Sequence, residues 1–141
     1  LAVYGLRDGR LIRLAATPPI GRTHRWLAVA GIADFDGDSG VEIAYIDRPH
    51  LIKTLRVVEV RHGLSGWSLV PELEASGYTN HHIGSSEIEG GLRQCGDAPE
   101  LVLSDGGWQR VVVLSGQGGR WSRRDLGPYT GPESLRAALG C

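Results

Sequence analysis

Methionine is absent from the 141 residues of this chain, and phenylalanine occurs only once. Because the first residue is Leu1 and no methionine is present, we expect either a processed mature form or a piece of a longer protein. No apolar run approaches the roughly 20 residues that a membrane span requires, so we expect no membrane span. The 15 basic residues are balanced by 16 acidic ones, which gives a formal net charge of -1. This balance provides no general attraction to nucleic acid, and we expect no nucleic-acid partner.

Cysteine is almost as scarce. Cys95 and Cys141 are the two cysteines, and neither lies in a CxxC motif. Two such cysteines are either free thiols in a reducing compartment or one disulfide in an exported protein. Catalytic signatures such as Gly-x-Ser-x-Gly, a P-loop or HExxH are also missing, so we expect a non-catalytic protein. The 21 glycines and 7 prolines instead predict many turns and few long helices.

What the chain does contain is an internal repeat. Residues 1–9 align with residues 55–63, and Trp67 aligns with Trp121, each at a spacing of about 54 residues. In each copy an apolar stretch is followed by a glycine-containing turn and a second apolar stretch, which predicts a β-hairpin. A second apolar segment, Glu42 to Asp47, also has a counterpart later in the chain. The period therefore covers more than one hairpin.

The repeat predicts an all-β chain built of four-stranded antiparallel units. In the first complete unit the strands are expected at residues 26–33, 41–47, 51–61 and 67–74. In the second unit they are expected at residues 82–88, 100–104, 110–115 and 121–126. A four-stranded unit that recurs every 40 to 60 or so residues is typical of a β-propeller blade. The alternative interpretation is a small open β-sandwich with accidental internal similarity.

The chain is thus predicted to be a partial β-propeller with a short helical tail. Its parts are a half blade at 1–21, a blade at 22–76, a blade at 77–127 and the tail at 128–141. The second strand of the first full blade is apolar on both faces, which predicts burial between neighbouring blades. Propellers typically have about 4 to 8 blades, so two and a half cannot close a ring. Further blades would have to come from the same gene or from another chain.

An acidic turn lies between the first two strands of the first full blade. Its first, third, fifth and ninth residues are carboxylates, and the carbonyl of the seventh can add a backbone ligand. These residues are Asp34, Asp36, Asp38, Gly40 and Glu42. An all-oxygen set suits a hard cation, and Ca²⁺ more than Mg²⁺, while the flanking strands exclude an EF-hand. The alternative is a solvated acidic turn.

Residues 34–44 resemble the FG-GAP/VCBS repeat, the blade unit of integrin-α-type β-propellers and of many bacterial secreted proteins. The resemblance extends over about residues 22–74, although the Phe-Gly and Gly-Ala-Pro tags of the family are missing. It implies that the five residues of the turn bind Ca²⁺. It also implies a calcium-stabilised binding or interaction module, periplasmic or extracellular, with a protein or carbohydrate partner. Two alternatives stay open: a domain of, or accessory to, a secreted hydrolase of glycans or phosphoesters, and a structural subunit whose ring other chains complete.

The second blade has a degenerate version of this turn. When Glu100 is aligned with Glu42, the other loop positions fall on Leu92, Gln94 and Gly96, none of which is a carboxylate. Cys95 lies within this loop, and we expect a Cys95–Cys141 disulfide to pin the tail to the last blade in place of a metal. Free or buried thiols are the alternative. Residues 130–133 predict a capping box, followed by a short helix that ends before the penultimate glycine.

A polar and aromatic group recurs just before the first strand of both blades. Its members are Thr23, His24, Arg25, Trp26, Thr79, Asn80, His81 and His82. In a propeller these residues would gather at the mouth of the channel, where they could bind a small anion, a sugar or a peptide. Hydrogen bonding between adjacent blades is the alternative. Adjacent strand residues point to opposite faces, which argues against the two consecutive histidines as a metal pair.

Overall fold

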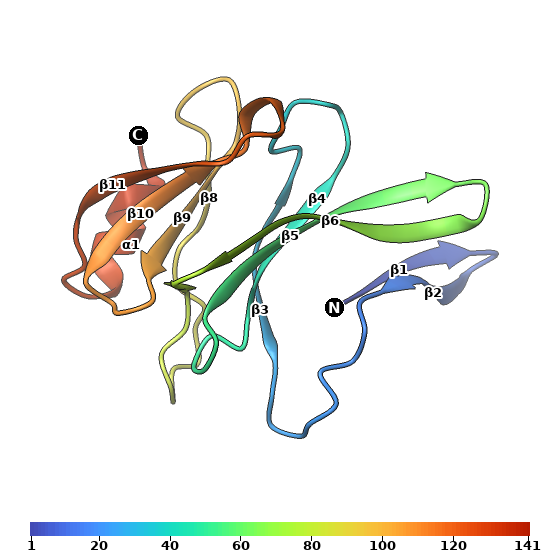
Figure 1. Ribbon diagram of the computed structural model, residues 1–141, viewed down its shortest axis with the longest axis horizontal. Coiled ribbons are helices and arrows are strands. Elements are labelled where there is room, and N and C mark those ends of the chain that lie inside the picture. The colour runs from blue at the N-terminus through green and yellow to red at the C-terminus, as the bar shows by residue number, and fades with distance from the viewer.

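The computed structural model describes residues 1–141 as three antiparallel β-sheets with one short α-helix near the C-terminus (Figure 1). The strands are β1 (Ala2–Arg7), β2 (Arg10–Ala16), β3 (Leu27–Ala33), β4 (Glu42–Asp47), β5 (Thr54–Gly63), β6 (Gly66–Ser76), β7 (Tyr78–Thr79), β8 (Gly91–Arg93), β9 (Glu100–Asp105), β10 (Arg110–Ser115) and β11 (Ser122–Pro128). The helices are the 3-10 turn η1 (Gln117–Gly119) and α1 (Pro132–Leu139). The predicted all-β class with a C-terminal helix is confirmed, and no closed ring of sheets is present.

The predicted four-stranded unit is observed once in complete form. One sheet has the strand order β3-β4-β5-β6, and the hairpin β1–β2 forms a second sheet of its own. In the third sheet the order is β11-β10-β9, and both β7 and β8 pair with β9. The third strand of the complete unit begins three residues later than predicted. Arg48 and Lys53 adopt positive φ in the turn that precedes it, which keeps this segment out of the sheet.

The strand predicted at residues 82–88 is wrong. Two short strands, β7 and β8, pair with opposite ends of β9, and the residues between them leave the sheet. The Ser85 N–H donates to the His82 carbonyl at 3.1 Å, which closes a turn. Gly90 has φ of +77°, and a Cβ there would lie 2.2 Å from the Val102 carbonyl oxygen. Only glycine lets the chain return to β9 at this point.

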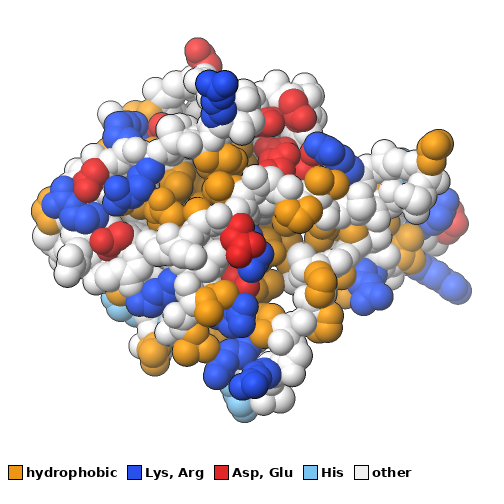
Figure 2. All heavy atoms as spheres, in the orientation of Figure 1, with side chains coloured by type: hydrophobic (Ala, Val, Ile, Leu, Met, Phe, Trp, Pro, Cys, Tyr) orange, Lys and Arg blue, Asp and Glu red, His pale blue; other side chains and the backbone are white.

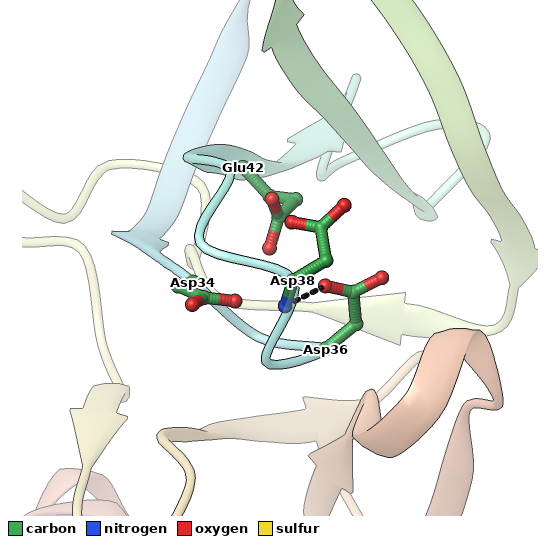
Figure 3. A group of neighbouring side chains, drawn as sticks. All are labelled: Asp34, Asp36, Asp38 and Glu42. Carbon is green, nitrogen blue, oxygen red and sulfur yellow. Dashed lines mark hydrogen bonds between the residues drawn. The ribbon is translucent and has the colours of Figure 1, made fainter.

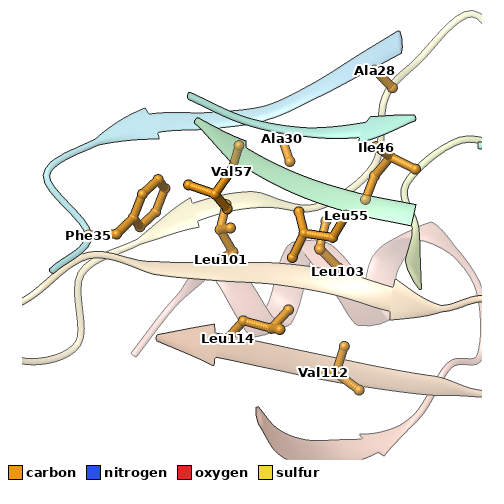
Figure 4. Close-up of a cluster of buried hydrophobic side chains, with 11 residues drawn as sticks. Ala28, Ala30, Phe35, Ile46, Leu55, Val57, Leu101, Leu103, Val112 and Leu114 are labelled. Carbon is orange, nitrogen blue, oxygen red and sulfur yellow. The ribbon is translucent and has the colours of Figure 1, made fainter. Parts of the chain in front are cut away.

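The main core lies between the β3–β6 sheet and the β9–β11 sheet (Figure 4). It contains Ala28, Ala30, Phe35, Ala44, Ile46, Leu55, Val57, Leu101, Leu103, Val112 and Leu114. All six residues of β4 are buried. Its alternate side chains Ile43 and Tyr45 face the other way and pack against Leu1 and Val3 of the hairpin side. The prediction that this strand is buried on both faces is confirmed.

Helix α1 covers the outer face of the third sheet. Leu135 is completely buried there, against Val102, Val111 and Val113. No helix of the chain has the length and apolar character needed to cross a membrane. The C-terminal residue that follows the helix, Cys141, is disulfide-bonded to the third sheet's degenerate turn, as predicted.

The predicted capping box at the start of α1 is wrong. The helix begins at Pro132, so Gly131 occupies the N-cap position and makes no side-chain cap. Gly131 has φ of +124°, which a residue with a side chain rarely adopts. Ser134 closes the first turn instead: its hydroxyl donates to the Gly131 carbonyl at 2.6 Å and accepts from the Thr130 N–H at 3.2 Å.

Removing the disulfide should destabilise the protein. Cys95 and Cys141 are separated by 46 residues, with Cα atoms 5.4 Å apart. A loop of this length is credited with about 4 kcal/mol by the chain-entropy model, and measured losses are typically 2–4 kcal/mol. We expect the double variant Cys95→Ser/Cys141→Ser to lose about that much in urea unfolding, and reduced wild-type protein to match it. Equal midpoints for oxidised and reduced protein would contradict this expectation.

Candidate metal centre

The turn that joins β3 and β4 brings its four acidic side chains together (Figure 3). Asp34, Asp36, Asp38 and Glu42 each offer a carboxylate oxygen, and these oxygens lie within 4.8 Å of one another. Figure 2 shows acidic side chains gathered in the upper middle of one face, over this turn. The four residues that the sequence predicted as a set are therefore one spatial cluster that could hold a metal ion.

Hydrogen bonds from the turn's own backbone hold the aspartates in place. Asp34 accepts from the N–H groups of Gly37 at 2.7 Å and Ser39 at 3.0 Å. Asp36 accepts from the Asp38 N–H at 3.1 Å, and Asp38 from the Gly40 N–H at 2.6 Å. Gly37 and Ser39 both have positive φ, so the chain coils tightly around the carboxylates. The turn therefore positions the acidic groups by its own backbone.

A single aromatic residue anchors the turn between the two sheets. Phe35 is completely buried, and its ring lies 5.5 Å from that of Trp121, the residue before β11. The Asp36 carbonyl accepts from the Gly118 N–H at 3.1 Å, which ties the turn to the β10–β11 connection. The acidic turn is thus fixed by the main core on one side and by the neighbouring sheet on the other.

Glu42 is the most unusual of the four carboxylates because it is completely buried. Its Oε2 accepts from the Phe35 N–H at 2.6 Å, but its Oε1 has no hydrogen-bond partner. Burial raises the pKa of Glu42, and the charges of Asp36, Asp34 and Asp38 raise it further against the lowering effect of the Phe35 N–H. A buried carboxylate with a free oxygen is costly unless an opposite charge faces it. A cation in the turn would meet this requirement.

Gly40 allows the carboxylates to converge. A Cβ at this position would lie 2.6 Å from Asp38 Oδ1 and 3.1 Å from both Glu42 Oε1 and Glu59 Oε1. A side chain here would therefore displace the acidic groups. The contribution of the Gly40 carbonyl as a ligand remains a prediction.

Two further acidic residues, Glu59 and Glu72, were missed by the sequence analysis. Glu59 on β5 pairs directly with Glu42 in the strand register. Glu72 lies on β6, and its pKa is raised to about 7 by burial and then by the charges of Glu42, Asp36 and Glu59. The sequence does show Glu59 as a single carboxylate within the apolar residues of β5. That it lies opposite Glu42 is known only from the strand register.

The predicted ligand group is only partly brought together. Trp26 and His81 meet edge to face, with ring centroids 4.6 Å apart. His50, which the sequence did not single out, joins them, with its Nε2 2.7 Å from His81 Nδ1. Thr23 lies in the exposed segment before β3, and its neighbours His24 and Arg25 line a cavity of about 250 Å³ with Trp26 and His50.

The remaining members of that group lie elsewhere. Thr79 is buried and donates to the Pro49 carbonyl at 2.9 Å, and Asn80 is completely buried beside it. His82 stacks on Trp108 at 3.5 Å, and its Nδ1 lies 2.8 Å from Glu89 Oε1. His81 and His82 therefore have separate partners, although neither of them lies in a strand.

No protein-family model, curated protein or solved structure matches this chain in the comparisons made with each. The candidate sites therefore rest on the geometry of the chain itself.

The raised pKa of Glu72 predicts a pH-dependent stability in calcium-free buffer. Below its ordinary value of 4.5 this carboxyl is protonated in both folded and unfolded chains. Between 4.5 and about 7 only the unfolded chain ionises it, so stability falls as pH rises through this window. We expect Glu72→Gln to raise the melting temperature relative to wild type at pH 8 by more than at pH 5.

The matched control is Glu74→Gln, two residues along the same strand, where the carboxylate is exposed and paired with Arg56. Its difference from wild type should be the same at both pH values. If Glu72→Gln behaved like this control, the carboxyl would have an ordinary pKa and the prediction would be wrong.

Proposed function

We propose that this chain is a calcium-stabilised binding module of the FG-GAP/VCBS type, in which the four-stranded sheets are blades of a β-propeller. Three features support the proposal. The β3–β6 sheet carries its acidic turn between its first two strands, and a second sheet packs against it face to face. A Cβ on Gly31 of β3 would lie 2.6 Å from Leu92, so the innermost strands of the two sheets approach closely, as radially arranged blades do.

The observation that carries the calcium assignment is the buried Glu42 Oε1 without a partner, in a cluster of four carboxylates within 4.8 Å. Carboxylates are hard oxygen ligands, and a flexible set of this kind favours Ca²⁺ over Mg²⁺. The ion's role is structural: it offsets the mutual repulsion of the acidic groups and locks the turn between the sheets.

The cavity beside Trp26 is the surface that we propose for the partner. Arg25, Arg48 and two histidines line it together with the tryptophan, which is 37% exposed. Cationic and aromatic side chains of this kind suit an acidic group of a protein or the ring of a sugar. The disulfide supports an oxidising compartment, and we propose a periplasmic or extracellular location.

A second candidate function is a structural subunit whose ring is completed by additional strands. In the internal repeat β1 corresponds to β5 and β10, each of which has a strand on both sides. β1 pairs with β2 alone, and a cavity of about 580 Å³ opens between the segment after β2 and the outward face of β4 to β6. Leu27, Tyr45 and Leu69 contribute apolar surface to that cavity.

If copies of the chain supply those strands to one another, light scattering should give a solution mass well above 15.2 kDa. Pairing through β1 should be lost when Tyr4→Pro removes one backbone donor from this strand. A wild-type mass of 15.2 kDa at every concentration would contradict completion by copies of the same chain.

Calcium should stabilise the wild-type protein. At a calcium concentration about 100-fold above the Kd, linkage predicts about 2.7 kcal/mol of added stability. We expect a rising melting temperature in a calcium titration, a return to the starting value with EDTA, and no rise in Asp36→Ala. Asp97→Ala is the matched control, because Asp97 lies in the degenerate turn of the third sheet and should leave the calcium response intact. A wild-type melting temperature that does not change with calcium concentration would contradict the proposal.

A further inference from the structure

Glu59 reaches the acidic turn from a different part of the chain. It lies on β5, directly opposite Glu42 in the antiparallel register, so the two side chains share one face of the sheet. The Oε1 atoms of both residues lie 3.1 Å from the point that a Gly40 Cβ would occupy. Glu59 thus approaches the turn from the strand side, next to Glu42 and Asp38.

The surroundings of Glu59 do not compensate its charge fully. Its side chain is 9% exposed, and a cationic group meets it at Oε2. The Arg61 guanidinium contacts it as an ion pair, but this side chain is 52% exposed and is shielded by water. One half-exposed positive charge thus faces Glu59 together with the four carboxylates of the turn. Buried like charges at such separations repel strongly without a cation.

We infer that Glu59 is a cation-binding carboxylate that extends the proposed calcium site from the β3–β4 turn onto β5. This inference rests on the proposed function and adds a ligand that the turn's own sequence does not contain. Two observations carry it beyond the acidic cluster itself. Glu42 is completely buried and its Oε1 has no hydrogen-bond partner. The Oε1 of Glu59, whose side chain is 9% exposed, lies as close as Glu42 Oε1 to the point that a Gly40 Cβ would occupy. The bound cation would therefore join the turn to the third strand of its sheet.

The competing interpretation is that Glu59 serves only as the ion-pair partner of Arg61. The two roles predict opposite changes in the melting temperature of the calcium-free protein when Glu59 loses its charge. If Glu59 is a cation ligand, Glu59→Gln relieves repulsion among the carboxylates of the calcium-free protein and raises its melting temperature. The same substitution then weakens calcium binding by roughly 10- to 100-fold. Arg61→Gln removes a competing positive charge and tightens calcium binding.

The experiment compares wild type, Glu59→Gln, Arg61→Gln and Glu74→Gln. Calorimetric titration with CaCl₂ measures affinity, and thermal unfolding in EDTA and in saturating calcium measures stability. Glu74→Gln is the control for loss of a carboxylate that pairs with an arginine on the neighbouring strand, and it should leave calcium affinity unchanged. Should Glu59→Gln fail to fold, Glu59→Asp keeps the negative charge beside Arg61 but shortens the side chain, and it should weaken calcium binding only if Glu59 is a ligand.

Unchanged calcium affinity in Arg61→Gln, with a folded Glu59→Gln also unchanged, would overturn the inference. The inference about Glu59 would also fail if Glu59→Gln and Arg61→Gln lowered the melting temperature of the calcium-free protein equally, as loss of a simple ion pair does. Failure of the proposed function has a different signature, since the wild type itself would then show no calcium binding. Calcium binding by wild type together with opposite shifts in the two variants supports both proposals.

Discussion

β4 runs between two apolar surfaces, and the burial of all six of its residues constrains everything around it. Ala44 and Ile46 face the third sheet, and Ile43 and Tyr45 face the side of the hairpin. Because the strand cannot turn either face to water, its position fixes the spacing of the sheets on both sides. The acidic turn starts directly after β3 and ends at Glu42, the first residue of β4. Its geometry is therefore fixed by the same packing.

The turn shows how apolar packing and charge depend on each other in this molecule. Phe35 is buried in the main core, and the residues on both sides of it are acidic. The N–H of this anchoring residue also bonds to Glu42, a carboxylate whose pKa is raised by burial. The hydrophobic contact therefore holds Glu42 away from water, while the three aspartates of the turn stay partly or fully exposed. A cation bound in the turn would offset the mutual repulsion of the four carboxylates and so stabilise the fold.

Much of this arrangement could be predicted from the sequence, because its signals are local. The alternation of side chains, the glycine-containing turns and the spacing of Asp34 to Glu42 identified the strands and the acidic cluster. Sequence-based prediction failed where the local structure depends on a contact with residues far away in the chain. The segment around Gly90 is shaped by its close approach to β9, and Gly131 replaced the expected cap because the helix begins one residue later. Glu59 and His50 became visible only through strand register and the packing of separate loops.

The outer face of the third sheet is covered, which distinguishes one end of the molecule from the other. α1 packs on the outer face of that sheet, and the disulfide fastens the end of that segment to the same sheet. At the opposite end the hairpin leaves apolar surface of the β4–β6 face around an open cavity. The two ends of the molecule therefore differ: α1 covers the outer face of the third sheet, whereas the outward face of β4 to β6 borders an open cavity. The disulfide keeps the helix on its sheet, and so keeps this difference between the two ends, while the surroundings stay oxidising.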